Sequence, residues 1–341
     1  MSTLPRADKR TPCRRLVALS IGMSLFAPGL KSAPPGEWAR VADLPEANGG
    51  FVCAAVDGEI VVAGGTNWQA DVKLWLDGIW AYNPSRDAWR TFERLESPVA
   101  YAAGGNDAGA QCFAGGTSGK YTHRWLWRWE LGPSVKRVAA IDAGLVHASG
   151  VLVSDKLYTI GGTDDQARLD HSTNAFRAID LRTGQSERLA DYPETGFIVG
   201  AAAACGDRIF VFGGARWDAT NQQVMNLATA NVYTLSTGRW SSLKPLSSSN
   251  RGISALALDE THILLAGGFK GDAEGFSSEV CVFEVKGGNY RATRPLPYEA
   301  MGMGLVKIGE WLYCMGGEDR RRHRTAVVYR IRWKDLLAAG P

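Results

Sequence analysis

The sequence lacks the features that mark a disulfide-stabilised or membrane-spanning protein. Its six cysteines are scattered, and the five that lie beyond residue 33 form an odd set without regular spacing. This pattern excludes a disulfide framework and is typical of small buried side chains in strands. The longest apolar run, residues 16–30, is shorter than the roughly 20 residues that a transmembrane helix needs.

Basic charge is confined to the start of the chain. The whole chain has a formal net charge of +3, but residues 1–33 hold six basic side chains and one acidic one, which leaves 32 basic against 34 acidic residues. The remainder is therefore close to neutral and lacks the basic face that nucleic acids or anionic membrane surfaces require. We expect neither class of partner.

Metal-binding and nucleophile motifs are also missing. The five histidines are scattered without the spacing of metal ligands, and there is no nucleophile elbow, phosphate loop or zinc signature. The sequence therefore predicts no metal and no cofactor.

The first 33 residues resemble a secretory signal. Five basic residues lie within residues 1–15, and the apolar run of residues 16–30 follows them. We expect a signal peptide over residues 1–33, a mature domain over 34–341 and a periplasmic or secreted location. Arg14-Arg15 leaves the twin-arginine route open beside the ordinary one.

Glycine pairs recur along the rest of the chain at spacings of 51, 46, 52, 54 and 49 residues. They are Gly64-Gly65, Gly115-Gly116, Gly161-Gly162, Gly213-Gly214, Gly267-Gly268 and Gly316-Gly317. A period near 50 indicates the blades of a β-propeller, so six pairs predict six blades.

Each blade shows the same order of strand signals. A run of small residues and a tight turn precede a β-rich run that ends at the glycine pair, as in residues 200–212. A third strand with an aromatic and a fourth strand with Trp or Leu follow, as in Trp80 to Tyr82 with Trp89. Blade two departs most, because Trp125 to Trp129 forms its third strand and no tryptophan marks the fourth.

The last repeat supplies three strands, of which residues 325–331 are the third. A fourth-strand signature, residues 37–41, precedes blade one. The N-terminal segment is therefore expected to complete blade six, which closes the ring and removes open sheet edges. The fold class is all-β, a six-bladed propeller, and the recurring Gly-Gly, Tyr, Trp order resembles the kelch motif.

Functional side chains are expected on the face that carries the second-to-third strand loops and the loops between blades. Glu318 and Arg324 belong to the former loops. The loops between blades supply the remaining candidates, which are Asn48, Tyr101, Asn250 and Arg251.

One segment carries a more specific resemblance. Gly317-Glu318, five further residues and Arg324-Thr325 resemble the segment with the active-site glutamate and arginine in the bacterial N-acetylneuraminate (sialic acid) mutarotases, which are exported kelch propellers. The order of motifs through the ring closure is similar to a circularly permuted form of that family. The loop of residues 270–278 is short where family members carry a long insertion.

The resemblance implies a mutarotase for N-acetylneuraminate or a similar acidic sugar. Glu318 would act as general acid and base in opening and closing the sugar ring, and Arg324 would hold the carboxylate. Tyr101, Asn48, Asn250 and Arg251 would contact the substrate.

Two alternatives remain open at this point. Glu318 could simply pair with one of the neighbouring arginines in a solvated loop. The protein would then be a non-catalytic kelch propeller that binds a glycan or a protein partner on the same face.

Overall fold

A computed structural model describes residues 34, 36–107, 110–130 and 134–338. The expected signal peptide, residues 1–33, lies outside the described residues. In the part that is described, strands dominate, and they form six four-stranded antiparallel sheets and two two-stranded hairpins.

The six sheets follow one plan, in which four strands run in order from the innermost to the outermost. Blade one contains β2 (Val52–Val56), β3 (Glu59–Ala63), β6 (Gly78–Asn83) and β7 (Ala88–Arg94). Blade two contains β8 (Ala103–Asp107), β9 (Ala110–Ala114), β10 (Trp125–Glu130) and β11 (Ser134–Ala140). Blade three contains β12 (Ser149–Val153), β13 (Lys156–Ile160), β14 (Phe176–Asp180) and β15 (Ser186–Arg188).

The second half of the chain repeats this plan. Blade four contains β16 (Ala201–Cys205), β17 (Arg208–Phe212), β20 (Ala230–Thr234) and β21 (Arg239–Ser242). Blade five contains β22 (Ser254–Ala257), β23 (His262–Ala266), β24 (Val280–Glu284) and β25 (Asn289–Ala292). Blade six contains β26 (Gly304–Ile308), β27 (Trp311–Met315), β28 (Val328–Arg332) and β1 (Ala39–Val41).

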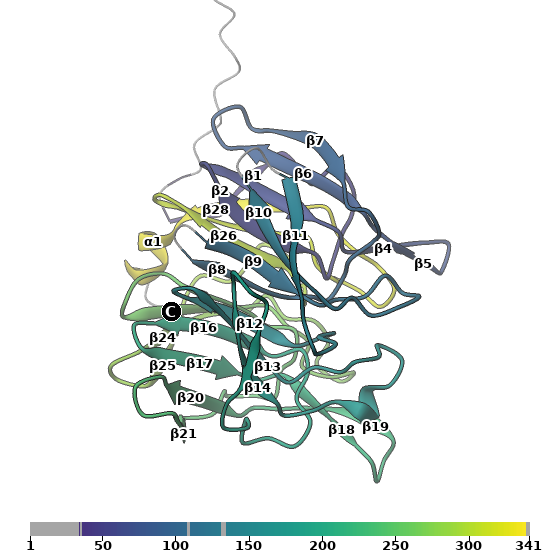
Figure 1. The fold of residues 1–341 in the computed structure, drawn as a ribbon. Coiled ribbons are helices and arrows are strands. Elements are labelled where there is room, and N and C mark those ends of the chain that lie inside the picture. The colour runs from purple at the N-terminus through teal and green to yellow at the C-terminus, as the bar shows by residue number, and fades with distance from the viewer. Residues whose placement is uncertain (1–33, 35, 108–109, 131–133, 339–341) are drawn as a thin grey trace, which may run out of the picture. The chain divides into compact units, whose positions relative to one another are not determined.

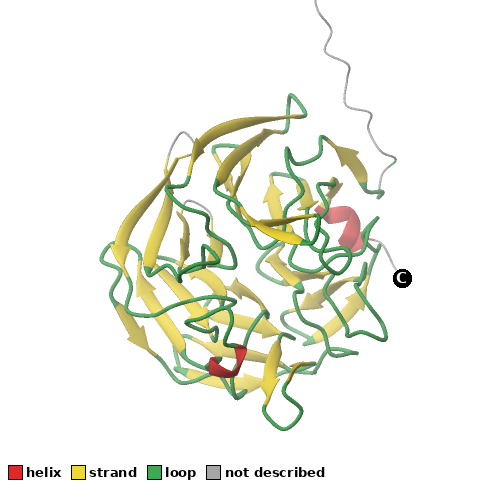
Figure 2. Cartoon of the chain, turned by 90° about the vertical axis from the view of Figure 1, so that its right-hand side faces the viewer, coloured by secondary structure: helices red, strands yellow, loops and turns green. Residues whose placement is uncertain are grey.

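The innermost strands form a closed circle. Each of β2, β8, β12, β16 and β22 contacts the innermost strand of the next blade, and β26 contacts β2 again. The sheets accordingly surround a common centre (Figures 1 and 2). This arrangement confirms the predicted six-bladed propeller.

The two ends of the folded chain meet in blade six. β1 pairs antiparallel with β28, with Arg40 opposite Tyr329. The segment after β1 also bonds to blade one, because the Trp89 indole donates to the Ala42 carbonyl and the Ala42 amide donates to Asp87. The N-terminal segment therefore holds the first and last blades together, as expected.

The third strand of blade six is shorter than the sequence predicts. We expected it over residues 325–331, but β28 begins at Val328. The Thr325 carbonyl accepts from the Asn48 amide and the Ala326 carbonyl from the Leu44 amide. Thr325 and Ala326 thus bond to the N-terminal segment rather than to a neighbouring strand, and β28 begins after them.

The glycine pairs are required by close backbone contact. Gly64 and Gly65 both have positive φ, at 63° and 101°. A Cβ on Gly64 would lie 2.0 Å from the Val99 carbonyl oxygen, and the Gly65 amide donates to that same oxygen. The pair thus ties the end of β3 to the loop that leads into the next blade.

Two hairpins extend from the second-to-third loops of blades one and four. They are β4 (Thr66–Gln69) with β5 (Val72–Trp75), and β18 (Ala215–Asp218) with β19 (Gln223–Asn226). Both hairpins extend on the same side of the sheets (Figure 1). The sequence did not predict them, since their strands are short and do not alternate clearly between apolar and polar residues.

Candidate functional site

A ring of six equivalent backbone positions marks one end of the central channel. Each position has positive φ and lies two residues before an innermost strand; the six are Gly50, Tyr101, His147, Val199, Gly252 and Gly302. From the second to the sixth, each amide donates to the carbonyl of the position before it, over 2.8–3.0 Å. We call these six residues the mouth ring.

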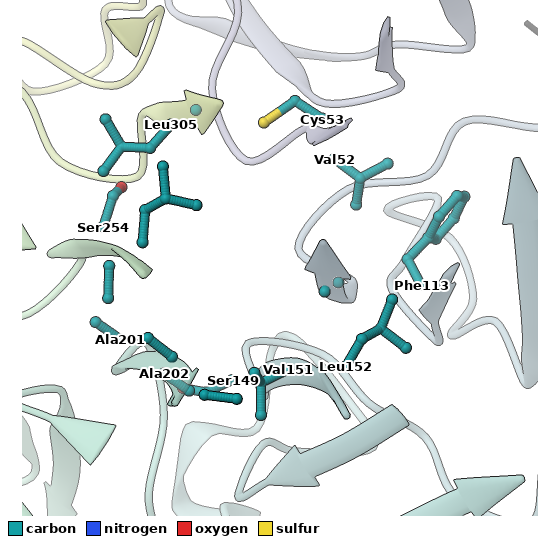
Figure 3. Close-up of a pocket in the computed structure, with 18 of the residues that line it drawn as sticks. Val52, Cys53, Phe113, Ser149, Val151, Leu152, Ala201, Ala202, Ser254 and Leu305 are labelled. Carbon is teal, nitrogen blue, oxygen red and sulfur yellow. The ribbon is translucent and has the colours of Figure 1, made fainter. Parts of the chain in front are cut away.

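The channel beyond the mouth ring contains a cavity of about 650 Å³. The innermost strands line it with small or apolar side chains, including Val52, Ala201 and Leu305, around an open centre (Figure 3). Burial raises the pKa of the Cys53 thiol to about 12, so this cysteine is a thiol rather than a reactive thiolate. Ser149, Ser254 and Lys307 add polar side chains to this lining.

Glu318 and Arg324 lie side by side next to the mouth ring. Arg324 Nη1 is 2.5 Å from Glu318 Oε2, and the exposed fractions of the two side chains are 4% and 17%. The Gly49 backbone contacts the arginine so closely that a Cβ there would lie 2.5 Å from Arg324 Cδ. Glycine at position 49 thus leaves room for this guanidinium.

Tyr101 connects that ion pair to the mouth ring. Its hydroxyl lies 3.3 Å from Arg324 Nη2 and 3.2 Å from the Thr66 hydroxyl. Burial alone would raise the pKa of Tyr101, but the positive charges of Lys73 and Arg324 outweigh it and lower the pKa below its ordinary value. The phenol is therefore prepared to donate a proton or a strong hydrogen bond.

Lys73 approaches Tyr101 from the β4–β5 hairpin. Its Nζ lies 4.7 Å from the ring centroids of both Trp75 and Tyr101, which is cation–π geometry. Trp75 meets Tyr101 edge-on, with ring centroids 6.0 Å apart. His147 also packs against Tyr101, with ring centroids 4.4 Å apart and the ring planes tilted by 38°. We call Lys73, Trp75, Tyr101, His147 and Arg324 the mouth cluster.

Asn48 and Asn250 occupy equivalent buried positions beside glycine pairs. The side-chain Nδ2 of Asn48 donates to the Gly64 carbonyl, and its Oδ1 accepts from the Thr66 backbone amide. The Asn250 amide donates to the Gly267 carbonyl, and its Oδ1 has no hydrogen-bond partner in the described structure. Both side chains are thus engaged with the backbone under the loops, and contact with a ligand remains a prediction.

Arg251 lies one blade away from the ion pair. Its guanidinium stacks over Phe269 at 4.8 Å and donates to Asn226 at the end of the second hairpin. Burial lowers its pKa, against the opposing effect of the Asp272 and Glu318 carboxylates. Its positive charge therefore adds to that of Arg324 near Glu318.

The structure thus brings Glu318, Arg324 and Tyr101 together and places Arg251 on the adjacent blade. It adds Lys73, Trp75 and His147, which the sequence analysis missed. Lys73 and Trp75 lie on the unpredicted hairpin, and their signal was limited to a Trp-rich stretch after the first glycine pair. His147 occupies the same step of the repeat as Tyr101, which an alignment of the six blades would have revealed.

The described residues include no helix long and apolar enough to cross a membrane. They also contain no cluster of three or more histidine, cysteine or acidic side chains arranged to hold a metal ion.

Comparison with known proteins supports the repeat. Residues 47–95, which comprise blade one, match the family described as Kelch motif. A kelch domain-containing protein of Vibrio cholerae is 28% identical over 156 residues, which are 45% of this chain and 42% of that protein. Spermatocyte protein spe-26 of Caenorhabditis elegans is 27% identical over 184 residues, 54% of this chain and 31% of its own.

A third relative extends over more of the chain. Kelch-like protein 35 of Mus musculus is 23% identical over 274 residues, which are 79% of this chain and 43% of that protein. The chain therefore spans less than half the length of each of these three relatives. With the six glycine pairs and the closed circle of six sheets, these matches identify the chain as a six-bladed β-propeller whose first blade carries a kelch motif.

Proposed function

We propose that this propeller is a non-catalytic binding protein that holds a glycan with an acidic group at the mouth cluster. The observation that carries the proposal is the contact of both Lys73 and Arg324 with Tyr101. Two cations next to aromatic rings favour a ligand that offers both a negative group and an apolar face.

Glu318 fits a binding role without proton transfer. Its carboxylate contacts the Arg324 guanidinium, and carboxylate oxygens also accept hydrogen bonds from sugar hydroxyls. Glu318 can therefore contribute to binding by accepting hydrogen bonds alone.

A protein partner is the other occupant that this face suits. Val72 and Tyr121 are the two large hydrophobic side chains that are exposed in the described residues, at 61% and 54%. Both belong to second-to-third loops, on neighbouring blades one and two. Exposed apolar side chains next to polar ones are typical of protein interfaces.

The second candidate function is an exported mutarotase for N-acetylneuraminate or a similar acidic sugar. The adjacency of Glu318 and Arg324 favours it, because one residue could transfer protons while the other orients the sugar carboxylate. Tyr101, with its lowered pKa, lies within the same group.

NMR spectroscopy with N-acetylneuraminate distinguishes these functions. Saturation transfer from the protein reports binding, and exchange spectroscopy reports interconversion of the anomers. We expect saturation transfer without faster exchange, and loss of the signal in Arg324→Gln but not in Arg321→Gln, which changes an exposed arginine of the same loop.

Other outcomes of this experiment assign the function differently. Accelerated exchange that Glu318→Gln abolishes would establish the mutarotase and overturn the binding proposal. Absence of both signals would contradict both sugar-directed functions and leave the protein partner, which Val72→Asp with Tyr121→Asp would then test in binding assays.

We also propose that the protein is exported and that residues 1–33 are removed as a signal peptide. The charge and apolar pattern of those residues supports this. Mass spectrometry of the protein from its native cell should give a mature N-terminus near residue 34, and an intact leader would contradict the proposal.

A further inference from the structure

The mouth ring carries side chains on one half and none on the other. Gly50, Gly252 and Gly302 adopt the left-handed conformation in blades one, five and six of the closed ring, where it is free of steric cost. Tyr101, His147 and Val199 adopt the same conformation at φ values of 58°, 61° and 54°. L-residues with a Cβ disfavour this conformation, and a β-branched valine does so most.

The backbone does not need these three side chains. The ring of amide-to-carbonyl hydrogen bonds runs through glycine and non-glycine positions alike. Glycine would therefore complete the ring in every blade at lower cost. Backbone strain of this kind concentrates at functional sites. Of the three side chains, only those of Tyr101 and His147 carry hydrogen-bonding groups, so these two are the candidates for a functional purpose.

His147 has hydrogen-bonding capacity that the protein leaves unused. Across the described ranges, neither nitrogen of its ring makes a hydrogen bond with the protein, although the ring packs against Tyr101. Burial, aided by the Lys73 charge, lowers the pKa of His147 to about 4. The neutral ring offers one donor and one acceptor, which together match a sugar hydroxyl.

The opposite side of the ring leaves room for such a ligand. Blade six lies opposite blade three, because the two are three blades apart in either direction around the ring of six. A Cβ built on Gly302 would meet no atom within 4 Å, so open space faces the ring there. Because Tyr101 contacts Arg324 and also packs against His147, a ligand held at Arg324 and Tyr101 would lie beside the imidazole.

We propose that His147 is a ligand-contacting residue at the propeller mouth, where its imidazole exchanges hydrogen bonds with a hydroxyl group of a polyhydroxylated ligand. The inference rests on the proposed function and adds a residue that neither the motif nor the resemblance assigns. The strained conformation is retained at position 147 because the imidazole contacts the ligand.

The test compares His147→Gly with His147→Asn in purified protein. Both residues tolerate the left-handed conformation, but asparagine keeps a donor and an acceptor. We expect His147→Gly to weaken binding of N-acetylneuraminate about fivefold to tenfold, the effect of one hydrogen bond. We expect His147→Asn to recover part of that loss, and Tm in both variants to stay at or about 2 °C above the wild-type value.

Val199→Gly is the matched control. It relieves the same conformation one blade away and should raise Tm without changing affinity. If the wild-type protein binds the sugar and His147→Gly binds it equally well, the inference is overturned while the proposed function stands. If His147→Gly lowers Tm by several degrees, the imidazole is structural and the inference is also overturned. If the wild-type protein does not bind the sugar, the proposed function fails and the inference fails with it.

Discussion

At the scale of single residues, the electrostatics of the mouth depend on the balance between burial and charge at Tyr101. Burial opposes ionisation of the phenol, while Lys73 and Arg324 favour it strongly enough to lower the pKa. Lys73 lies on an outer hairpin and Arg324 on blade six, so the balance depends on two distant parts of the chain.

Removing Lys73 should therefore raise the pKa of Tyr101. We expect ultraviolet titration to show one tyrosine that ionises below the ordinary value of about 10, and this component should be missing in Tyr101→Phe. In Lys73→Met it should shift upward, because burial then outweighs the single remaining cation. An unchanged titration in Lys73→Met would contradict this account.

The same shift has a consequence for stability. A phenol with a lower pKa in the folded than in the unfolded state stabilises the folded protein once it ionises. The free energy of unfolding should rise, relative to Tyr101→Phe, as the pH increases from the folded pKa toward 10. Chemical denaturation at pH 8 and pH 10 measures this difference.

Asn48 and Asn250 permit a second comparison at this scale. Asn48 makes two hydrogen bonds to the backbone and Asn250 makes one, in equivalent buried positions. We expect Asn48→Ala to lower the free energy of unfolding by about 2 kcal/mol and Asn250→Ala by about 1 kcal/mol. Urea denaturation measures both values, and equal losses would show that the hydrogen-bond count does not govern stability here.

At the scale of elements, the sequence predicts what repeats and misses what does not. The second strands were predicted well, because β3, β13, β17, β23 and β27 each precede a glycine pair that backbone contact requires. The fourth strand of blade two, β11, has no tryptophan signal, yet it pairs with β10, and Arg137 stacks over Trp125 at 5.0 Å. Packing against neighbours supplies what local sequence does not.

The candidate site was predicted in part for the same reason. Glu318 and Arg324 follow a glycine pair and could be placed by counting from it. His147 and Lys73 depend on a backbone conformation and a hairpin that tertiary contacts impose. No pattern in the sequence identifies Lys73, and His147 is found only by aligning it with Tyr101 across the blades.

The closing strand β1 is the element whose removal should matter most. Val41 and Leu44 are buried, and the Leu44 amide donates to the Ala326 carbonyl of blade six. A chain that starts at residue 45 should lose about 4 kcal/mol, from two buried aliphatic side chains at about 2 kcal/mol each. Thermal unfolding beside a chain that starts at residue 34 provides the comparison, and equal Tm values would refute the closure role.

At the scale of the whole molecule, the five cysteines beyond residue 33 report on the ring. They lie in five different blades, at Cys53, Cys112, Cys205, Cys281 and Cys314. Burial raises the pKa of each thiol to about 11 or 12. Each thiol should therefore react slowly with thiol-specific reagents while its blade remains folded.

The closed circle predicts that this protection is lost in all blades together. Each innermost strand packs against two neighbours, so opening one blade exposes apolar surface on both sides and destabilises the next. With a thiol-reactive disulfide reagent at rising urea concentration, the five thiols of the chain from residue 34 should react at one common rate. In the chain from residue 45, Cys314 should react first, since its blade has lost β1. If Cys314 kept pace with the others in that shortened chain, the cooperativity of the ring would not depend on the contact between its first and last strands.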